Sequence, residues 1–323
     1  MSSSGSHTYY SNGKLLLTGE YVVLDGALSL ALPTLYGQYL TVTEIKPPKI
    51  IWNSLDEKNT SWFKTEIHTD LSGEITPYDT KATIRNEAKT NANKEITGRL
   101  LTILKAAREL NPSFLKGTCG YEITTTLSFP RNWGLGSSST LINNVAQWAK
   151  VDAFTLLFNS FPGSGYDIAC AQHHHPLTYQ LHAKAPVVKQ AKFHPSFAAQ
   201  LYFVHLNKKQ DSGTGIERYR AVGKNTAHAV RVISDITQKI ERTSDLNTFE
   251  TLIEAHEDCI ADLIKLPKVK TRLFRDYPGT IKSLGAWGGD FILATGNAQT
   301  PDYFRTKGYN TIVPYDKMIR NHT

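Results

Sequence analysis

The sequence contains few cysteines and no cysteine pair of the kind that binds metal. Its three cysteines, Cys119, Cys170 and Cys259, are far apart in the chain and odd in number. Since no C-x-x-C pair occurs, the sequence indicates neither a zinc site nor a disulfide framework. Buried free thiols in a reducing compartment are the plain interpretation.

Long apolar runs, internal repeats and low-complexity segments are also missing. No uninterrupted apolar stretch approaches the roughly 20 residues that a membrane-spanning helix needs. Residues 1–10 are small and polar and lack the apolar centre of a signal peptide. These absences lead us to expect a cytoplasmic protein without a membrane partner.

Basic residues outnumber acidic ones, but they are not concentrated in one place. The 323 residues include 36 lysines and arginines and 29 aspartates and glutamates, which gives a net charge of +7. This excess favours an anionic partner. Because no basic block or arginine-rich arm is present, we expect a small anionic substrate and no nucleic acid. The length suggests about two domains.

The stretch 133–140, Trp-Gly-Leu-Gly-Ser-Ser-Ser-Thr, is the feature around which the prediction is built. Gly134 and Gly136 lack the Cβ atoms that would hold the backbone away from an anion. The serines follow where a helix is expected to begin, and free N–H groups at a helix start bind phosphate. The stretch therefore predicts either a phosphate-binding loop or a Gly/Ser-rich turn that caps an ordinary helix.

Three further segments carry glycine beside charged residues. The first, near the N-terminus, places Lys14 and Glu20 next to apolar strands, where a charge is either a solvated strand end or part of a site. The second, 163–171, is a glycine turn before a helix start, with Asp167 just inside the helix. A favourable helix dipole alone also explains that aspartate. The third, Gly285–Asp290, is either a hairpin turn or a loop that approaches a ligand.

Hydrophobic patterns predict strands and helices along most of the chain. Strands are expected at 15–17, 28–32, 38–45, 50–52, 62–67, 121–127, 178–182, 201–206, 280–284, 291–295 and 310–314. Helices are expected over 95–110, 141–149, 219–240 and 246–263. Residues 21–24 are expected to form a short strand or turn, 53–61 a long exposed loop, and 183–195 a domain boundary.

A basic loop and several histidines are further site candidates. The loop after residue 206 offers Lys208 and Ser212, which either bind a substrate carboxylate or phosphate or form a solvated basic surface. His256 falls on the apolar face of the last long helix, which favours a core histidine over a catalytic one. His173–His175 lack the i, i+4 spacing that places metal ligands on one helix face.

Taken together and in this order, these segments resemble the motifs of the GHMP kinases, small-molecule kinases that include galactokinase, homoserine kinase, mevalonate kinase and phosphomevalonate kinase. The match extends over about residues 9–296. Gly13–Tyr21 resembles the first motif, Pro130 followed by Gly134–Ser138 the phosphate loop, and Gly285–Asp290 the glycine-rich third motif. Gly163–Ala169 is most similar to the segment of mevalonate and phosphomevalonate kinases that carries the catalytic aspartate.

The resemblance implies an α+β, two-domain GHMP kinase fold. Residues 1–190 would form the N-terminal ATP-binding domain, which is ribosomal protein S5 domain 2-like, and residues 191–323 a ferredoxin-like C-terminal domain. The implied activity is ATP-dependent phosphorylation of a small molecule with Mg²⁺. The details of the first and third motifs favour mevalonate or phosphomevalonate, and hence isoprenoid precursor synthesis.

The matched residues carry implied roles. Catalysis would depend on Asp167 and Lys14, with the lysine keeping the aspartate ionised. The implied ATP-binding residues are Gly134, Leu135, Gly136, Ser137, Ser138 and Ser139, and the Ser138 hydroxyl would also bind Mg²⁺. The expected substrate-binding residues are Glu20, Tyr21, Lys208, Ser212, Gly285, Gly288 and Gly289.

The sequence departs from the family pattern at several positions. Asn12 stands where the family usually has proline, Ser139-Thr140 replaces a pair of small residues, and Trp287 is a bulky insertion among glycines. No carboxylate stands at the expected distance before Asp167 for a second metal contact. Three alternatives therefore stay open: a GHMP-fold protein that binds a ligand without catalysis, a GHMP kinase that acts on a sugar, and a nucleic-acid binder. The oligomeric state is not readable from the sequence, and a homodimer is compatible with it.

Overall fold

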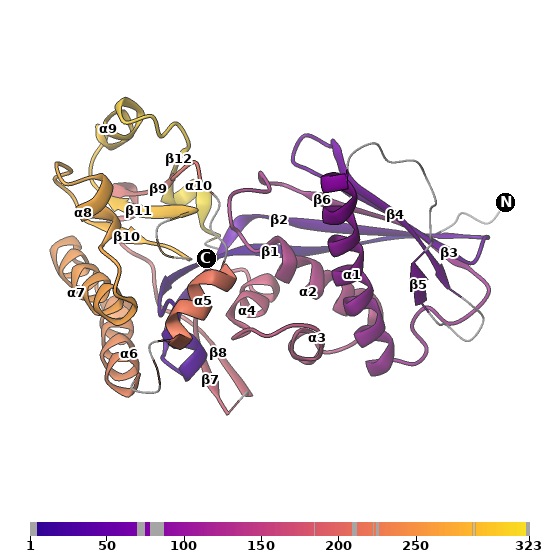
Figure 1. Cartoon of the computed structure of the whole chain (residues 1–323). Coiled ribbons are helices and arrows are strands. Elements are labelled where there is room, and N and C mark those ends of the chain that lie inside the picture. The colour runs from indigo at the N-terminus through magenta and orange to yellow at the C-terminus, as the bar shows by residue number, and fades with distance from the viewer. Residues whose placement is uncertain are drawn as a thin grey trace. The chain divides into compact units, whose positions relative to one another are not determined.

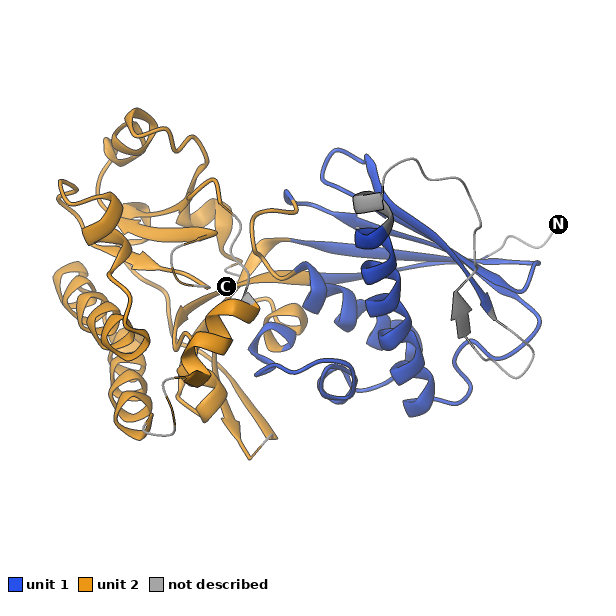
Figure 2. Cartoon of the chain, viewed as in Figure 1, with its two compact units in different colours: residues 1–11, 37–130, 137–168 blue, residues 12–36, 131–136, 169–323 orange. Residues whose placement is uncertain are grey.

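A computed structural model describes the chain apart from residues 1–4, 70–74, 78–86, 184, 209–211, 222, 224–225, 286, 288 and 321–323, and apart from the side chains of 69, 75–77, 87–90 and 212. Figure 1 shows its elements, and Figure 2 colours its two compact units. Unit 1 comprises residues 1–11, 37–130 and 137–168, and unit 2 comprises residues 12–36, 131–136 and 169–323. Both units are discontinuous in sequence, and the boundary predicted at residue 190 lies inside unit 2.

Unit 1 combines a sheet with helices. Its strand order is β5-β4-β3-β6-β2, and β1 also pairs with β2. The pairs β2–β6, β3–β4 and β4–β5 are antiparallel, whereas β3–β6 is parallel. The elements that lie wholly or partly in unit 1 are β1 (Ser6–Thr18), β2 (Ser29–Ile45), β3 (Lys49–Leu55), β4 (Ser61–Thr69), β5 (Ile75–Pro77), α1 (Glu87–Leu110), β6 (Gly120–Leu127), α2 (Ser137–Ala149), α3 (Ala153–Ser160) and α4 (Tyr166–Gln172).

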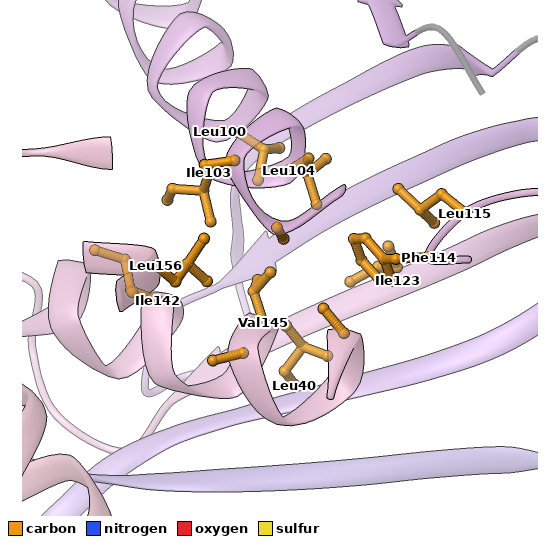
Figure 3. Close-up of a cluster of buried hydrophobic side chains, with 14 of the residues drawn as sticks. Leu40, Leu100, Ile103, Leu104, Phe114, Leu115, Ile123, Ile142, Val145 and Leu156 are labelled. Carbon is orange, nitrogen blue, oxygen red and sulfur yellow. The ribbon is translucent and has the colours of Figure 1, made fainter. Parts of the chain in front are cut away.

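The core of unit 1 forms between the helices and the sheet, as Figure 3 shows. Helix α1 contributes Leu100 and Leu104, which are spaced to lie on one helix face. Helix α2 contributes Val145, and the strands contribute Leu40 and Ile123. This packing fixes α2, and with it the helix start that follows the glycine stretch.

Unit 2 contains an antiparallel sheet in the order β10-β11-β9-β12, and a further pair of strands, β7 and β8, beside the first residues of β2. Its core includes Val204, Ile281, Ile292 and Phe304. The elements after α4 are β7 (Leu177–His182), β8 (Ala185–Gln190), a 3-10 helix (Ala198–Gln200), β9 (Leu201–His205), α5 (Ser212–Ala221), α6 (Ala227–Arg242), α7 (Leu246–Ile264), α8 (Val269–Leu273), β10 (Ile281–Ser283), β11 (Phe291–Thr295), α9 (Thr300–Thr306), β12 (Ile312–Pro314) and α10 (Tyr315–Met318).

Two predicted elements are wrong in extent, and each has a local cause. The single helix expected over 219–240 is divided into α5 and α6, because Gly223 adopts a left-handed φ of 91° that a continuous helix does not contain. The long loop expected over 53–61 is a short turn, because β3 continues to Leu55 and β4 begins at Ser61. Asp56 closes this turn by accepting hydrogen bonds from the backbone N–H groups of Lys58 and Thr60.

The structure adds detail to other local expectations. Residues 22–25 form a 3-10 helix, and the segment 183–195 includes β8, which pairs with β7. The cysteines are free, but only Cys170 is buried, whereas Cys119 is exposed and Cys259 half-buried. Across the described part of the chain, no helix is both long and apolar enough to cross a membrane.

Candidate functional site

The stretch 133–140 forms a glycine loop that leads directly into α2, as predicted. Gly134 and Gly136 have left-handed φ values of 66° and 88°, which a residue with a Cβ rarely adopts. Helix α2 begins at Ser137, and Ser138 is exposed while Ser139 is buried. The first N–H groups of a helix lack intrahelical partners and carry partial positive charge, so this start suits an anion.

Lys14 holds the first half of this loop in unit 2. Its Nζ donates a hydrogen bond of 2.9 Å to the carbonyl oxygen of Gly134, and its backbone N–H donates one of 3.0 Å to the carbonyl oxygen of Leu135. Trp133 packs edge-on against Phe291, with ring centroids 5.3 Å apart. These contacts fix the shape of the loop and hold the Lys14 ammonium against its backbone.

The last residue of the third motif, Asp290, packs against the same loop. A Cβ added to Gly134 would stand 2.4 Å from the Cγ of Asp290, so only glycine fits at position 134. The Asp290 backbone is tied to the strand end after β9, because its carbonyl oxygen accepts from Leu206 N and its N–H donates to Lys208 O. Unit 2 therefore brings together Lys14, the glycine loop and the end of the third motif.

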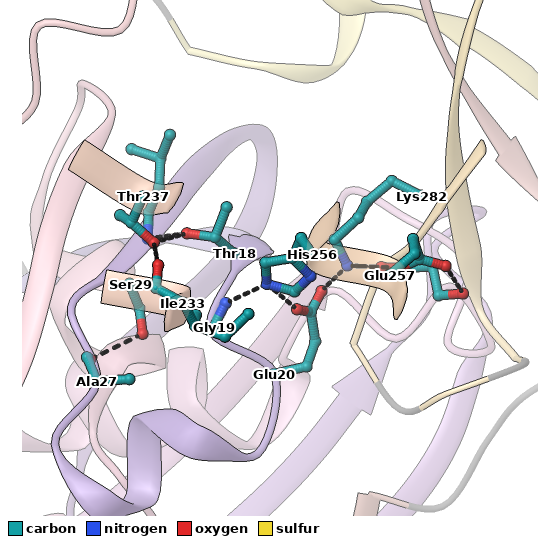
Figure 4. Close-up of polar contacts among 12 residues, drawn as sticks. Thr18, Gly19, Glu20, Ala27, Ser29, Ile233, Thr237, His256, Glu257 and Lys282 are labelled. Carbon is teal, nitrogen blue, oxygen red and sulfur yellow. Dashed lines mark hydrogen bonds and ion pairs between the residues drawn. The ribbon is translucent and has the colours of Figure 1, made fainter. Parts of the chain in front are cut away.

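Glu20 of the first motif lies in a buried network of charged groups (Figure 4). Its Oε1 is 2.6 Å from the Nζ of Lys282, which is also 3.1 Å from the Oε1 of Glu257. Ser283 donates to the other oxygen of Glu257. His256 accepts from the backbone N–H of Gly19 at its Nε2, which is 3.3 Å from the Oε2 of Glu20. All four ionisable side chains are at most 1% exposed.

The network contains two acidic and two basic side chains, and burial and the neighbouring charges together shift the pKa of each. Burial raises the pKa of Glu20 to about 7, although the nearby Lys282 acts in the opposite direction. Burial likewise raises the pKa of Glu257. Burial alone would lower the pKa of Lys282, but the two carboxylates outweigh it, so that pKa is raised and the ammonium stays charged. Burial and the charge of Lys282 lower the pKa of His256 well below its ordinary value, so the ring is neutral.

The raised pKa of Glu20 predicts a pH-dependent difference between the wild type and Glu20→Gln. The native state holds a proton on Glu20 up to about pH 7, whereas the unfolded chain releases it near 4.5. The contribution of Glu20 to stability is therefore lost as pH rises through this window. The unfolding free energy of Glu20→Gln minus that of wild type should therefore become more positive, by up to about 3 kcal/mol, as pH rises from 4.5 to 8.

Urea unfolding of both proteins across this pH range measures the effect. His256 has a lowered pKa and gives both proteins a slope of opposite sign below about pH 6.5, so the comparison rests on the difference between them. Glu95→Gln is the control, because that side chain is 66% exposed on α1. A wild-type-to-variant difference that stays constant with pH would show that Glu20 titrates normally.

Tyr21 links the first motif to the third. Its hydroxyl accepts a hydrogen bond of 3.0 Å from the backbone N–H of Trp287, and its ring stacks on Tyr219 at 5.8 Å. The indole N–H of Trp287 donates to the carbonyl oxygen of Pro267. Trp287, which stands out among glycines in the sequence, is therefore a buried anchor for the third motif.

The structure places the remaining predicted residues as follows. Asp167 is half-buried in the first turn of α4 and belongs to unit 1, as do Ser137–Ser139. Lys208 is exposed, Gly285 is half-buried with a left-handed φ of 69°, and Gly289 is buried. Gly288 and the side chain of Ser212 lie outside the described part of the structure.

Sequence reasoning missed two members of the buried network, Lys282 and Glu257. The signals were present: Lys282 stands in an apolar strand segment, and Glu257 follows His256 on a buried helix face. Glu20 and Tyr21 were expected to contact substrate, and the structure shows their side chains engaged with protein groups. His256 is the core histidine that was predicted, although only its Nε2 is hydrogen-bonded among the described residues.

No group of three or more His, Cys, Asp or Glu residues in the described ranges is arranged to hold a metal ion. The glycine loop of unit 2 suits a phosphate group, because it offers left-handed glycines and the ammonium of Lys14. The start of α2, which follows the loop directly in the chain and belongs to unit 1, offers free N–H groups that also suit a phosphate. Mg²⁺ commonly reaches such sites with the phosphates and few protein ligands, so a dedicated cluster is not required.

Comparison with solved structures defines the fold class. The chain has the α+β fold of the GHMP kinases, which confirms the fold expected from the motifs. It is similar to Methanococcus jannaschii mevalonate kinase, with a TM-score of 0.68 and 14% identity over 99% of both chains. The sequence itself matches no protein-family model and no curated protein.

Two further structures show how wide this likeness is. Streptococcus pneumoniae phosphomevalonate kinase in complex with phosphomevalonate and AMPPNP has a TM-score of 0.61 and 15% identity, over 93% of this chain and 95% of that one. Lactococcus lactis galactokinase complexed with galactose has a TM-score of 0.63 and 14% identity, over 94% and 88%. The fold is therefore shared with kinases of different substrates.

Proposed function

We propose that the protein is an ATP-dependent small-molecule kinase. The observation that carries this proposal is the glycine loop: two left-handed glycines precede the start of α2, and Lys14 donates to the loop carbonyl. This arrangement offers an anion both backbone N–H groups and a lysine charge. The similarity to kinase structures that cover nearly the whole chain supports the same function.

Each proposed catalytic group has a defined task. Bound Mg²⁺–ATP would supply the phosphoryl group. The backbone N–H groups of residues 134–138 would bind its phosphates, and the Ser138 hydroxyl would face the metal. Lys14 would stabilise negative charge on the transferred group. Asp167 would accept the proton of a hydroxyl acceptor, or orient an acceptor that is already an ionised phosphate.

We propose mevalonate or phosphomevalonate as the acceptor. The support comes from the first and third motifs, which resemble those of the mevalonate-pathway kinases, and from the phosphomevalonate and mevalonate kinase structures among the similar folds. The galactokinase structure is similar to the same degree, so the overall fold does not separate these substrates. Lys208, exposed beside the Asp290 backbone, is the proposed contact for a substrate carboxylate or phosphate.

A coupled assay of ADP release tests the function. Purified protein with Mg²⁺ and ATP is offered mevalonate, phosphomevalonate or galactose in turn. We expect turnover of about 1–100 per second with one of the first two. Turnover with galactose alone would make the protein a sugar kinase. ATP binding without turnover of any acceptor would favour the non-catalytic alternative.

The remaining expectations stay proposals. A small anionic substrate as the partner, the absence of nucleic-acid and membrane partners, a homodimer, and a cytoplasmic location rest on the sequence alone. Salt dependence gives the nucleic-acid alternative a direct test, because its binding affinity should fall steeply as salt rises.

A further inference from the structure

The carboxylate of Asp290 occupies an unusual position for an acidic group. It lies in the space that a Cβ would fill at Gly134, within the proposed phosphate loop. The residue is only 8% exposed, and Phe291 after it is fully buried. A negative side chain is therefore held against the backbone of a loop that is suited to bind negative phosphates.

The backbone fixes that position firmly. Asp290 has a left-handed φ of 51°, a conformation that aspartate and asparagine adopt more readily than other residues with a Cβ. Both its N–H and its carbonyl oxygen are hydrogen-bonded, to Lys208 O and Leu206 N. These two hydrogen bonds hold the Asp290 carboxylate in place against Gly134.

Electrostatics restrict what Asp290 can do once a nucleotide binds. A carboxylate beside a triphosphate is repelled by it unless a cation lies between them. Lys14 supplies one positive charge at Gly134 O, and a triphosphate carries several negative charges. The nucleotide's divalent cation binds phosphate oxygens together with one or two carboxylates, and it usually keeps several waters.

We propose that Asp290 supplies a carboxylate oxygen, directly or through one water, to the Mg²⁺ that accompanies the nucleotide at the glycine loop. This inference rests on the proposed kinase function. It assigns the third motif a role in metal binding, through a residue that lies far from the glycine loop in the sequence and against it in the fold.

Calorimetric titration with AMPPNP, with and without MgCl₂, tests the proposal on Asp290→Asn. Asparagine has nearly the same shape and tolerates the left-handed conformation. Wild type should bind AMPPNP more tightly when Mg²⁺ is present, and the variant should lose about 10- to 100-fold of affinity for the magnesium complex. Metal-free AMPPNP should bind the variant as tightly as wild type or more tightly, because a repulsive charge is removed.

Two further variants complete the design. Asp290→Gly removes the carboxylate and suits the left-handed backbone, so the same loss of magnesium enhancement is expected from it. Asp302→Asn is the matched control, because that aspartate is 74% exposed on α9 and its ion pair among the described residues is with Arg305. It should leave both affinities unchanged.

The possible outcomes distinguish failure of the metal-binding role from failure of the proposed kinase function. Unchanged magnesium enhancement in Asp290→Asn overturns the metal role, and so does an equal loss with and without Mg²⁺, which would mean that Asp290 only shapes the loop. Failure of the wild type to bind AMPPNP in either condition overturns the proposed kinase function, and the inference with it.

Discussion

Replacing Lys282 with methionine is expected to lower the free energy of unfolding by about 3–5 kcal/mol. The ammonium is fully buried and lies within 3.1 Å of the carboxylates of both Glu20 and Glu257. Methionine fills a similar volume, so the loss measures charge more than packing. Without the lysine, two carboxylates that are at most 1% exposed would lose the cation they share.

The effect should depend on pH in a defined direction. The pKa values of Glu20 and Glu257 are already raised by burial, and removing Lys282 takes away the group that opposes this. Protonation of both carboxylates therefore relieves part of the destabilisation. The loss of unfolding free energy relative to wild type should become smaller as pH falls from 8 to 5. Chemical denaturation at several pH values measures both the size and the slope of the deficit.

Two comparisons make this result specific. Lys307→Met removes a lysine that pairs with Asp276 at 2.8 Å but is 36% exposed, and it should cost no more than about 1 kcal/mol. The triple change Glu20→Gln, Glu257→Gln and Lys282→Met should recover much of the lost stability, because no buried charge remains. A loss below about 1 kcal/mol in Lys282→Met alone would mean that the network is not a stabilising pair.

The local parts of the site could be predicted from the sequence. Gly134 and Gly136 predict a backbone conformation that only glycine adopts readily, and the spacing of apolar residues after Ser137 predicts a helix. Both signals lie within a few residues of one another, so they need no knowledge of the rest of the fold. The same holds for Asp167 in the first turn of α4.

The long-range parts could not be predicted, because their partners are remote in sequence. Lys282 and Glu20 are 262 positions apart, and no periodicity marks them as a pair. The contact between Gly134 and Asp290 likewise depends on the pairing of β9 with β11, which positions the residue before β11. Glu20, an expected substrate ligand, contacts the buried Lys282 in the tertiary structure, and its sequence neighbours do not predict that contact.

Replacing Lys14 with methionine is expected to reduce kcat by about two orders of magnitude or more while the protein stays folded. Lys14 is half-buried, and its Nζ donates to the Gly134 carbonyl oxygen, so the ammonium belongs to the proposed phosphate loop. Its removal takes away the positive charge that would stabilise the negatively charged phosphoryl group during transfer. Steady-state ADP release gives kcat and KM, and circular dichroism checks folding. Lys105→Met, on an exposed position of α1, is the matched control and should behave as wild type.

Asp167→Asn should cause a loss of similar size, and the double variant then shows whether the two residues serve one step. Groups that act as a unit are strongly non-additive, so removing both should cost little more than removing the more important one. Independent roles would instead multiply the two losses.

Asp167→Asn also distinguishes the two kinds of acceptor. If Asp167 removes a hydroxyl proton, the substitution should lower kcat and flatten the acidic limb of the pH profile. If the acceptor is an ionised phosphate, Asp167→Asn should leave that limb in place and raise KM for the acceptor, because only an orienting contact is gone. Near-normal turnover in either single variant removes that residue from the proposed mechanism.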